Sequence, residues 1–126
     1  QSISSIMPFP DDETEVKSQG QAYRTKLLRN DERIEEKEYL TDALSRECVD
    51  FINRNSKNPF FIYLAYNAPH GPLQATKEYL DRYDHIDDKN RKTYAAMVSA
   101  VDDGVGDIIS KLKEKGIYDN TIIYFL

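Results

Sequence analysis

A short apolar run followed by a proline-rich loop constrains the fold more than any other part of the sequence. Residues 60–66 are almost all apolar or aromatic, which suits a strand and is too short to span a membrane. Because the run is apolar on both faces, it predicts a strand of a parallel sheet that is covered on both sides. Pro69 and Pro72, with other turn-forming residues, predict a stiff loop around His70.

Helical patterns flank this run. Thr41 is a good N-cap, and apolar residues at helical spacing then predict a helix over 41–55. A short helix is expected to begin at Ala75 or Thr76 and to continue through Tyr83. An apolar stripe over 94–112 predicts the longest helix, which ends in lysines and a glycine, as helices commonly do.

A second buried strand is expected over 121–126, and the order strand, helix, strand predicts a parallel pair with a right-handed crossover. The fold class is therefore α/β, a partial parallel-sheet sandwich with helices packed on the sheet. A polar hairpin is expected around Asn30 and Asp31, with strands over 23–28 and 33–38. Residues 1–21 give an irregular lead-in. Because the chain stops on an apolar strand, we expect one domain, 1–126, that is an internal fragment of a larger one.

Composition argues against two classes of partner. The net charge of −5 over 126 residues argues against nucleic acid, which usually meets a basic patch. No apolar run approaches the roughly 20 residues that a membrane span needs. The single cysteine, Cys48, allows no internal disulfide, and its place on an apolar helical stripe predicts a buried, inert thiol.

His70 is the first candidate for chemistry. An imidazole can give or take a proton near neutral pH, or stabilise an oxyanion when charged, although a lone loop histidine is more often without function. Gln74 and Lys77 follow closely and are candidates for substrate binding on proximity alone. His85 lies in a charged link and is expected on the surface.

Three stretches together carry a family resemblance. They are residues 60–74 (FFIYLAYNAPHGPLQ), 94–106 (YAAMVSAVDDGVG) and 120–126 (NTIIYFL). In combination they resemble the type I, formylglycine-dependent sulfatases of the alkaline-phosphatase-like superfamily. The resemblance spans 39–126, the sulfatase-like core. It implies that the parent is an arylsulfatase-like sulfuric ester hydrolase acting on a sulfated small molecule or glycan. Hydrolysis would use a formylglycine hydrate, with calcium holding the sulfate oxygens.

The resemblance implies a catalytic role for one residue of this chain. In the family pattern, the histidine corresponding to His70 contacts the sulfate ester, stabilises the bound sulfate and assists proton transfer. Cys48 does not lie in the family's nucleophile motif, Cys/Ser-x-Pro/Ala-x-Arg, because both the proline and the arginine are missing. The resemblance also implies a periplasmic, secreted or lysosomal parent, which the sequence itself leaves open.

Acidic residues do not supply the family's metal site. Asp11 and Asp12 do not follow an apolar strand, as the family's paired calcium ligands do, and are interpreted as a solvated acidic run. Asp102, Asp103 and Asp107 do not converge around the helix as metal ligands would. We therefore expect no metal ligand in this chain, no calcium bound to it, and no activity when it is isolated.

Two alternatives remain open. The parent could instead be a related phosphodiesterase or phosphonate hydrolase, which would share the sheet. A different class is a small non-catalytic binding or assembly domain, in which His70 is incidental. As a fragment, the chain is expected to self-associate, because the strands at 60–66 and 121–126 have lost the neighbours that a full sheet would supply.

Overall fold

The computed structural model describes residues 27–126, together with the backbone of 3–4. The chain divides into two compact units, Gln1–Leu40 and Thr41–Leu126. The lead-in predicted over 1–21 lies almost entirely outside the described residues, as do Asp11 and Asp12.

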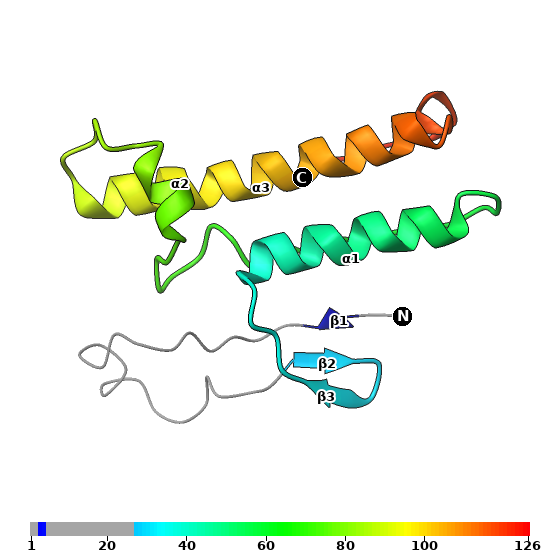
Figure 1. Ribbon diagram of the computed structural model, residues 1–126, viewed down its shortest axis with the longest axis horizontal. Helices are drawn as coiled ribbons and strands as arrows, with labels where there is room; N and C mark the ends of the chain where they lie inside the picture. Colours follow the sequence, from blue (N-terminus) through cyan, green and yellow to red (C-terminus); the bar gives the residue numbers. More distant parts are fainter. Residues whose placement is uncertain (1–2, 5–26) are drawn as a thin grey trace. The chain divides into compact units, whose positions relative to one another are not determined.

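The first unit contains a small antiparallel sheet of strands β1 (Ile3–Ser4), β2 (Leu27–Arg29) and β3 (Glu32–Ile34), in that order (Figure 1). Arg29 pairs with Glu32, so Asn30 and Asp31 form the turn. Asn30 has φ 57°, a left-handed conformation that asparagine tolerates better than most residues. The predicted hairpin is confirmed, although its second strand ends at Ile34, earlier than the predicted 38. Residues 23–26 lie outside the described residues.

The second unit is built on two long helices. Helix α1 (Leu40–Asn55) confirms the helix predicted over 41–55. It begins one residue earlier, so the prediction that Thr41 is the N-cap is wrong. Thr41 lies inside the first turn, fully buried, and among the described residues its Oγ1 has no hydrogen-bond partner.

The predicted short helix is α2 (Lys77–Asp81), for which Thr76 is the N-cap. Helix α3 (Lys89–Glu114) begins before the apolar stripe, because the Asp88 side chain accepts a hydrogen bond from the Arg91 backbone N–H at 2.7 Å. Gly116, at φ 68°, follows its last turn, as expected. A 3₁₀ turn, η3 (Tyr118–Asn120), leads into the last residues.

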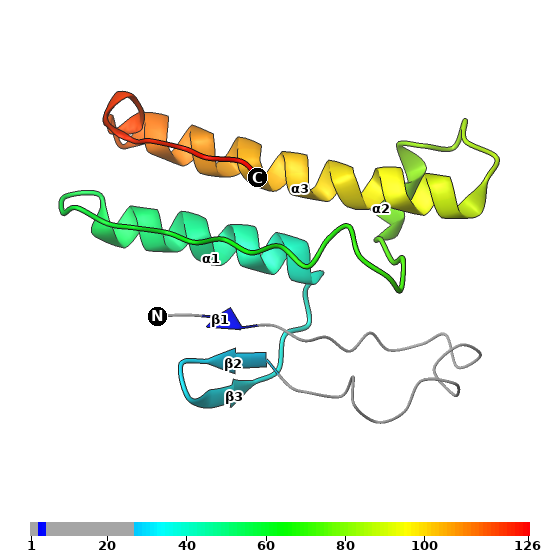
Figure 2. The ribbon, with the colours of Figure 1, turned by 180° about the vertical axis from the view of Figure 1, so that it is seen from behind.

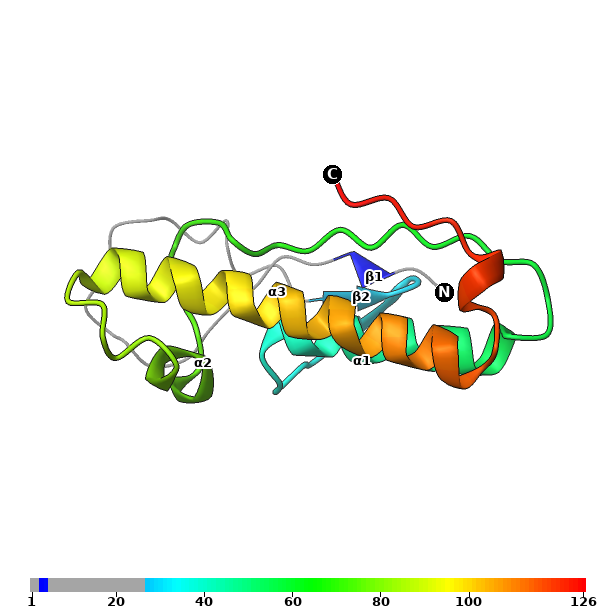
Figure 3. The ribbon, with the colours of Figure 1, turned by 90° about the horizontal axis from the view of Figure 1, so that it is seen from above.

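Helices α1 and α3 pack through a common apolar core. Its buried members are Cys48 and Ile52 of α1 and Leu112 of α3. An extended segment over 59–68 runs along α1 (Figure 2), and Phe60, Ile62 and Leu64 pack against this core. Figure 3 shows this segment and the C-terminal residues 121–126 on the same side of the helix pair.

These two segments are extended but are not strands. Exposed residues alternate with half-buried ones over 61–66, and Phe61 and Tyr63 are 85% and 83% exposed. No backbone hydrogen bond joins 60–66 to 121–126. The predictions of burial on both faces and of a parallel pair are therefore wrong for this chain, because a strand needs a hydrogen-bonded neighbour and a second covered face. In the described part of the chain, the only sheet is antiparallel.

None of the helices in residues 27–126 is both long and apolar enough to cross a membrane.

A glycine sets the close approach of α3 to α1 and to the extended segment. A Cβ at Gly104 would lie 2.1 Å from Ser45 Oγ and 2.6 Å from the Tyr66 hydroxyl oxygen. Both distances are shorter than any tolerable contact, so only glycine fits here without displacing its neighbours. Gly106, two residues further along α3, has no atom within 4 Å of an added Cβ.

These two glycines give a matched pair of substitutions. We expect Gly104→Ala to destabilise the protein by about 1–3 kcal/mol, the usual cost of overpacking. Gly106→Ala should stabilise it by up to about 1 kcal/mol, since alanine is the better helix former. Thermal denaturation of both variants checks this, and a Gly104→Ala variant that melts with or above wild type would contradict the close approach.

Candidate functional site

The candidate site is the loop that follows the extended segment, with His70 at its exposed tip. His70 Nδ1 lies 2.7 Å from the carbonyl oxygen of Gly71. A carbonyl can only accept, so Nδ1 carries the proton and donates it. In the neutral ring, Nε2 then holds the lone pair and can take a proton. In the charged ring, Nε2–H can donate to an anion.

Two tyrosines bind α1 from either end of this loop. The Tyr66 hydroxyl is 2.8 Å from Ser45 Oγ, and Ser45 Oγ in turn donates to the Thr41 carbonyl oxygen at 2.8 Å. The Tyr79 hydroxyl donates to Asp42 Oδ1, also at 2.8 Å. Burial is the main cause of the raised pKa of Tyr66, and burial and the bond to Asp42 raise that of Tyr79. Both hydroxyls are therefore protonated donors at neutral pH.

The sequence alone assigned no role to these hydroxyls. The available signal was general: a tyrosine that buries its ring usually finds a partner for its hydroxyl. The pKa of Asp42 is also raised, and burial is the largest cause. The hydrogen bond from Tyr79 lowers this pKa, but the effect of burial is larger.

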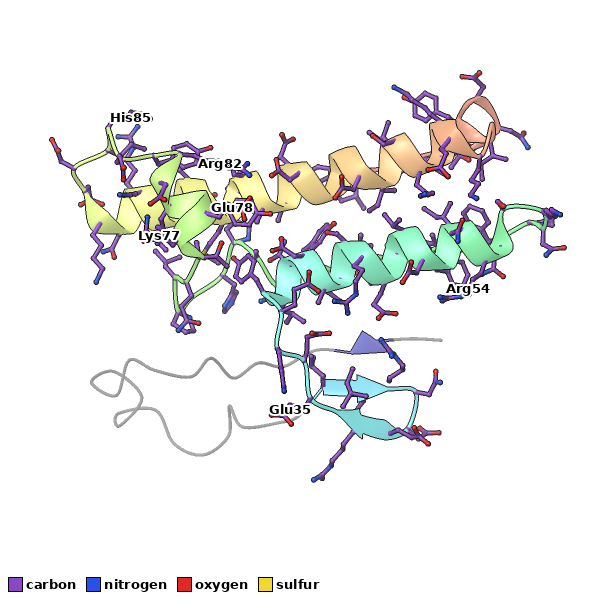
Figure 4. The ribbon with its side chains drawn as sticks, viewed as in Figure 1. Glu35, Arg54, Lys77, Glu78, Arg82 and His85 are labelled. Carbon is purple, nitrogen blue, oxygen red and sulfur yellow. The ribbon has the colours of Figure 1, made fainter. Side chains whose placement is uncertain are left out.

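The other predicted binding residues are placed differently from His70. Gln74 is half-buried in the loop. Lys77 opens α2, and its Nζ contacts both carboxylate oxygens of Asp81, at 2.7 and 2.6 Å. Figure 4 shows Lys77 on α2 with Glu78, close to Arg82. Lys77 is therefore engaged within its own helix. His70 and Gln74 both lie in the loop that precedes α2, whereas Lys77 is the first residue of that helix.

Arg82 and Asp103 connect the end of α2 to α3. Arg82 Nη1 lies 2.7 Å from Asp103 Oδ2, and the guanidinium also lies 4.7 Å from the centre of the Tyr79 ring. Asp103 is thus used in an ion pair, and Asp102 and Asp107 are exposed. In residues 27–126, no group of three or more histidine, cysteine or carboxylate side chains could hold a metal ion. These residues do not fit calcium. His85 is exposed, as predicted.

Cys48 is buried in the core between the helices and is a free thiol, as predicted. Burial raises its pKa from 9.0 to about 11. A thiol in this state is mostly protonated at neutral pH and is a poor nucleophile.

We expect Cys48 to react with a thiol reagent such as DTNB at least roughly 100-fold more slowly in the folded protein than after denaturation, because the thiolate is scarce and shielded. Labelling at pH 8 with and without guanidinium, followed by mass spectrometry of the Cys48 peptide, measures this ratio. Equal rates would show that the thiol is accessible.

The Sulfatase family model matches residues 8–126. Among solved structures, Ps i-CgsB superposes with a TM-score of 0.75 and 53% identity, over 79% of this chain and 22% of that one. This likeness is consistent with the alkaline-phosphatase-like fold that the sequence resemblance implied.

Curated relatives agree. A sulfatase of Escherichia coli K12, YdeN, is 40% identical over 79% of this chain and 18% of its own length. Human N-acetylgalactosamine-6-sulfatase is 34% identical over 68% of this chain and 16% of its own length. The matched part of the chain thus spans less than a fifth of the length of each of these two relatives. A match over nearly every residue shows that the chain belongs to the sulfatase family.

Proposed function

We propose that this chain is part of a larger sulfatase, its parent, that hydrolyses sulfate esters, and that it supplies the parent's catalytic histidine. The observation that carries the proposal is the state of His70, an exposed imidazole whose Nδ1–H is held by the Gly71 carbonyl. That bond directs the chemically active nitrogen, Nε2, away from the backbone carbonyl. Family membership supports the type of reaction, and this geometry supports Nε2 as the atom that would take part in it.

His70 would act at the leaving oxygen of the ester. Cleavage of the S–O bond leaves negative charge on that oxygen, and a proton from Nε2–H of the charged ring neutralises it. Before that step, the same N–H would donate to a sulfate oxygen and stabilise the bound anion. The Gly71 carbonyl accepts the hydrogen bond from Nδ1–H, which leaves Nε2 as the nitrogen that would meet the ester.

The nucleophile and the metal would come from other parts of the parent. A formylglycine hydrate supplies an oxygen nucleophile, and calcium would hold the sulfate oxygens. The described carboxylates do not fit a calcium site, so no step of this proposal passes through them. The buried Cys48 is not a nucleophile.

We propose a sulfated small molecule or glycan as the substrate. The glycan is supported by a second structure of Ps i-CgsB, which is a complex with the oligosaccharide k-i-k-neocarrahexaose. The sulfatase relatives favour a sulfate ester over the phosphodiester or phosphonate of related enzymes. Gln74, beside His70 in the loop, remains a candidate contact to the substrate.

The sharpest test replaces His70 in the full-length parent. We expect His70→Ala to lower kcat on an aryl or glycan sulfate by a factor on the order of 10² or more, the usual loss with a positioned acid–base group. The free energy of unfolding should change by less than about 0.5 kcal/mol, because the side chain is exposed. Steady-state kinetics beside a thermal melt measure both quantities.

The matched control is His85→Ala, which removes the second exposed histidine of the chain. It should leave both kcat and the melting temperature unchanged. Wild-type turnover in His70→Ala would show that the assigned role is wrong. A large drop in melting temperature would show that His70 is a structural residue instead.

We also propose that the chain produced by itself is inactive and self-associates. Its outward-facing apolar side chains on the two extended segments are largely exposed, namely Phe61, Tyr63, Ile122 and Tyr124. Such surfaces and unpaired backbone edges promote pairing between copies. Light scattering should show a dimer or larger species, and the double variant Tyr63→Lys, Tyr124→Lys should reduce its mass. A monomeric wild type, or turnover of an aryl sulfate, would contradict this proposal.

A further inference from the structure

We propose that the hydroxyls of Tyr66 and Tyr79 are positioning groups that tether the two ends of the His70 loop to one face of α1. The catalytic part of this inference rests on the proposed function, whereas the tether itself does not. The loop comprises residues 67–76, which lie between Tyr66 and the start of α2, the helix that carries Tyr79. The inference begins with the direction of the hydrogen bonds.

Both tyrosine hydroxyls donate to α1. Ser45 Oγ has a single proton, which it gives to the Thr41 carbonyl oxygen at 2.8 Å. The Tyr66 hydroxyl, 2.8 Å from the same Oγ, must therefore be the donor in their bond. The Tyr79 hydroxyl likewise donates to the Asp42 carboxylate, which can only accept when ionised. Replacing either tyrosine by phenylalanine thus removes one bond without removing the ring.

The two acceptors lie close together on α1. Asp42 and Ser45 are three residues apart, and side chains at that spacing are neighbours on one helix face. The chain therefore leaves α1 at Tyr66, forms the loop, and returns to the same face at Tyr79. At the first of these points, Gly104 of α3 provides the space in which the Ser45 and Tyr66 oxygens meet.

The tip of the loop has little packing of its own, although residues on either side of it are half-buried. All residues from Pro69 to Leu73 are exposed, and an added Cβ at Gly71 would meet no atom within 4 Å. A segment with few buried contacts takes its position from its anchors and its prolines. The place of the His70 ring in space therefore depends on the anchors at the two ends of the loop, and the two tyrosine hydroxyls are hydrogen-bonding groups on either side of it that reach α1.

The first experiment tests the tether by a measurement that does not use activity. Tyr66→Phe and Tyr79→Phe are made in the full-length parent, and amide hydrogen exchange is followed in peptides covering 67–76. The matched control is Tyr83→Phe, whose hydroxyl lies 2.6 Å from Ser99 Oγ of α3 and borders neither end of the loop. We expect exchange several-fold faster in the two tether variants and unchanged loop exchange in the control. Equal exchange in all three variants overturns the tether.

The second experiment tests positioning through a double-mutant cycle with His70→Ala. In the wild-type background, each tether variant should lower kcat roughly tenfold with little change in KM, since a small displacement of a catalytic group is costly. In the His70→Ala background, the same substitutions should cause no further loss. Equal losses in both backgrounds, or no loss in either, would overturn the positioning role.

A conservative rescue separates the hydrogen bond from general damage to the fold. Asp42→Asn keeps a side-chain oxygen that can accept from Tyr79, whereas Asp42→Ala does not. We expect Asp42→Asn to keep the loop exchange rate and the kcat of the wild type. Asp42→Ala should show the faster loop exchange and the lower kcat expected of Tyr79→Phe. Identical behaviour of the two would overturn the second tether. If His70→Ala itself keeps full turnover, the proposed function fails, and the exchange measurement still decides the tether.

Discussion

The close approach of α3 to α1 at Gly104 is the constraint on which the rest of this unit depends. Because Gly104 has no side chain, Ser45 Oγ and the Tyr66 hydroxyl meet beside its backbone. The same approach lets Ile52 and Leu112 become almost fully buried between the helices. Helix packing and the start of the His70 loop are thus set by one contact, and a single methyl group at Gly104 would disturb both.

Burial, and not surface charge, holds the helices together. Most of the ion pairs are solvent-exposed, such as Lys77 with Asp81, and pairs of this kind contribute little to folding. The apolar core of α1 and α3, extended by Ile62 and Leu64 of the segment that runs along α1, excludes far more surface from water. This core forms the rigid base to which the loop is attached.

The loop has an exposed tip that carries His70, and tyrosine hydroxyls at both of its ends are hydrogen-bonded to α1. His70 is exposed, so its position gains nothing from burial. Its orientation is defined locally by the Gly71 carbonyl, and we infer that Tyr66 and Tyr79 define the position of the loop. In the function proposed above, Nε2 of His70 is the nitrogen that acts, because Nδ1 is held by the Gly71 carbonyl.

The sequence by itself determined the features that depend on neighbours a few residues apart. Helical periodicity located α1 and α3, Asn30 marked the hairpin, and the proline-rich motif around His70 identified both the loop and the family. Only the tertiary structure decided which distant groups meet. The partners Ser45 and Tyr66 are 21 residues apart, and Asp42 and Tyr79 are 37 apart, so no local pattern specifies them. The predictions of strands over 60–66 and 121–126 failed for the same physical reason. An apolar run becomes a strand only beside a hydrogen-bonded neighbour.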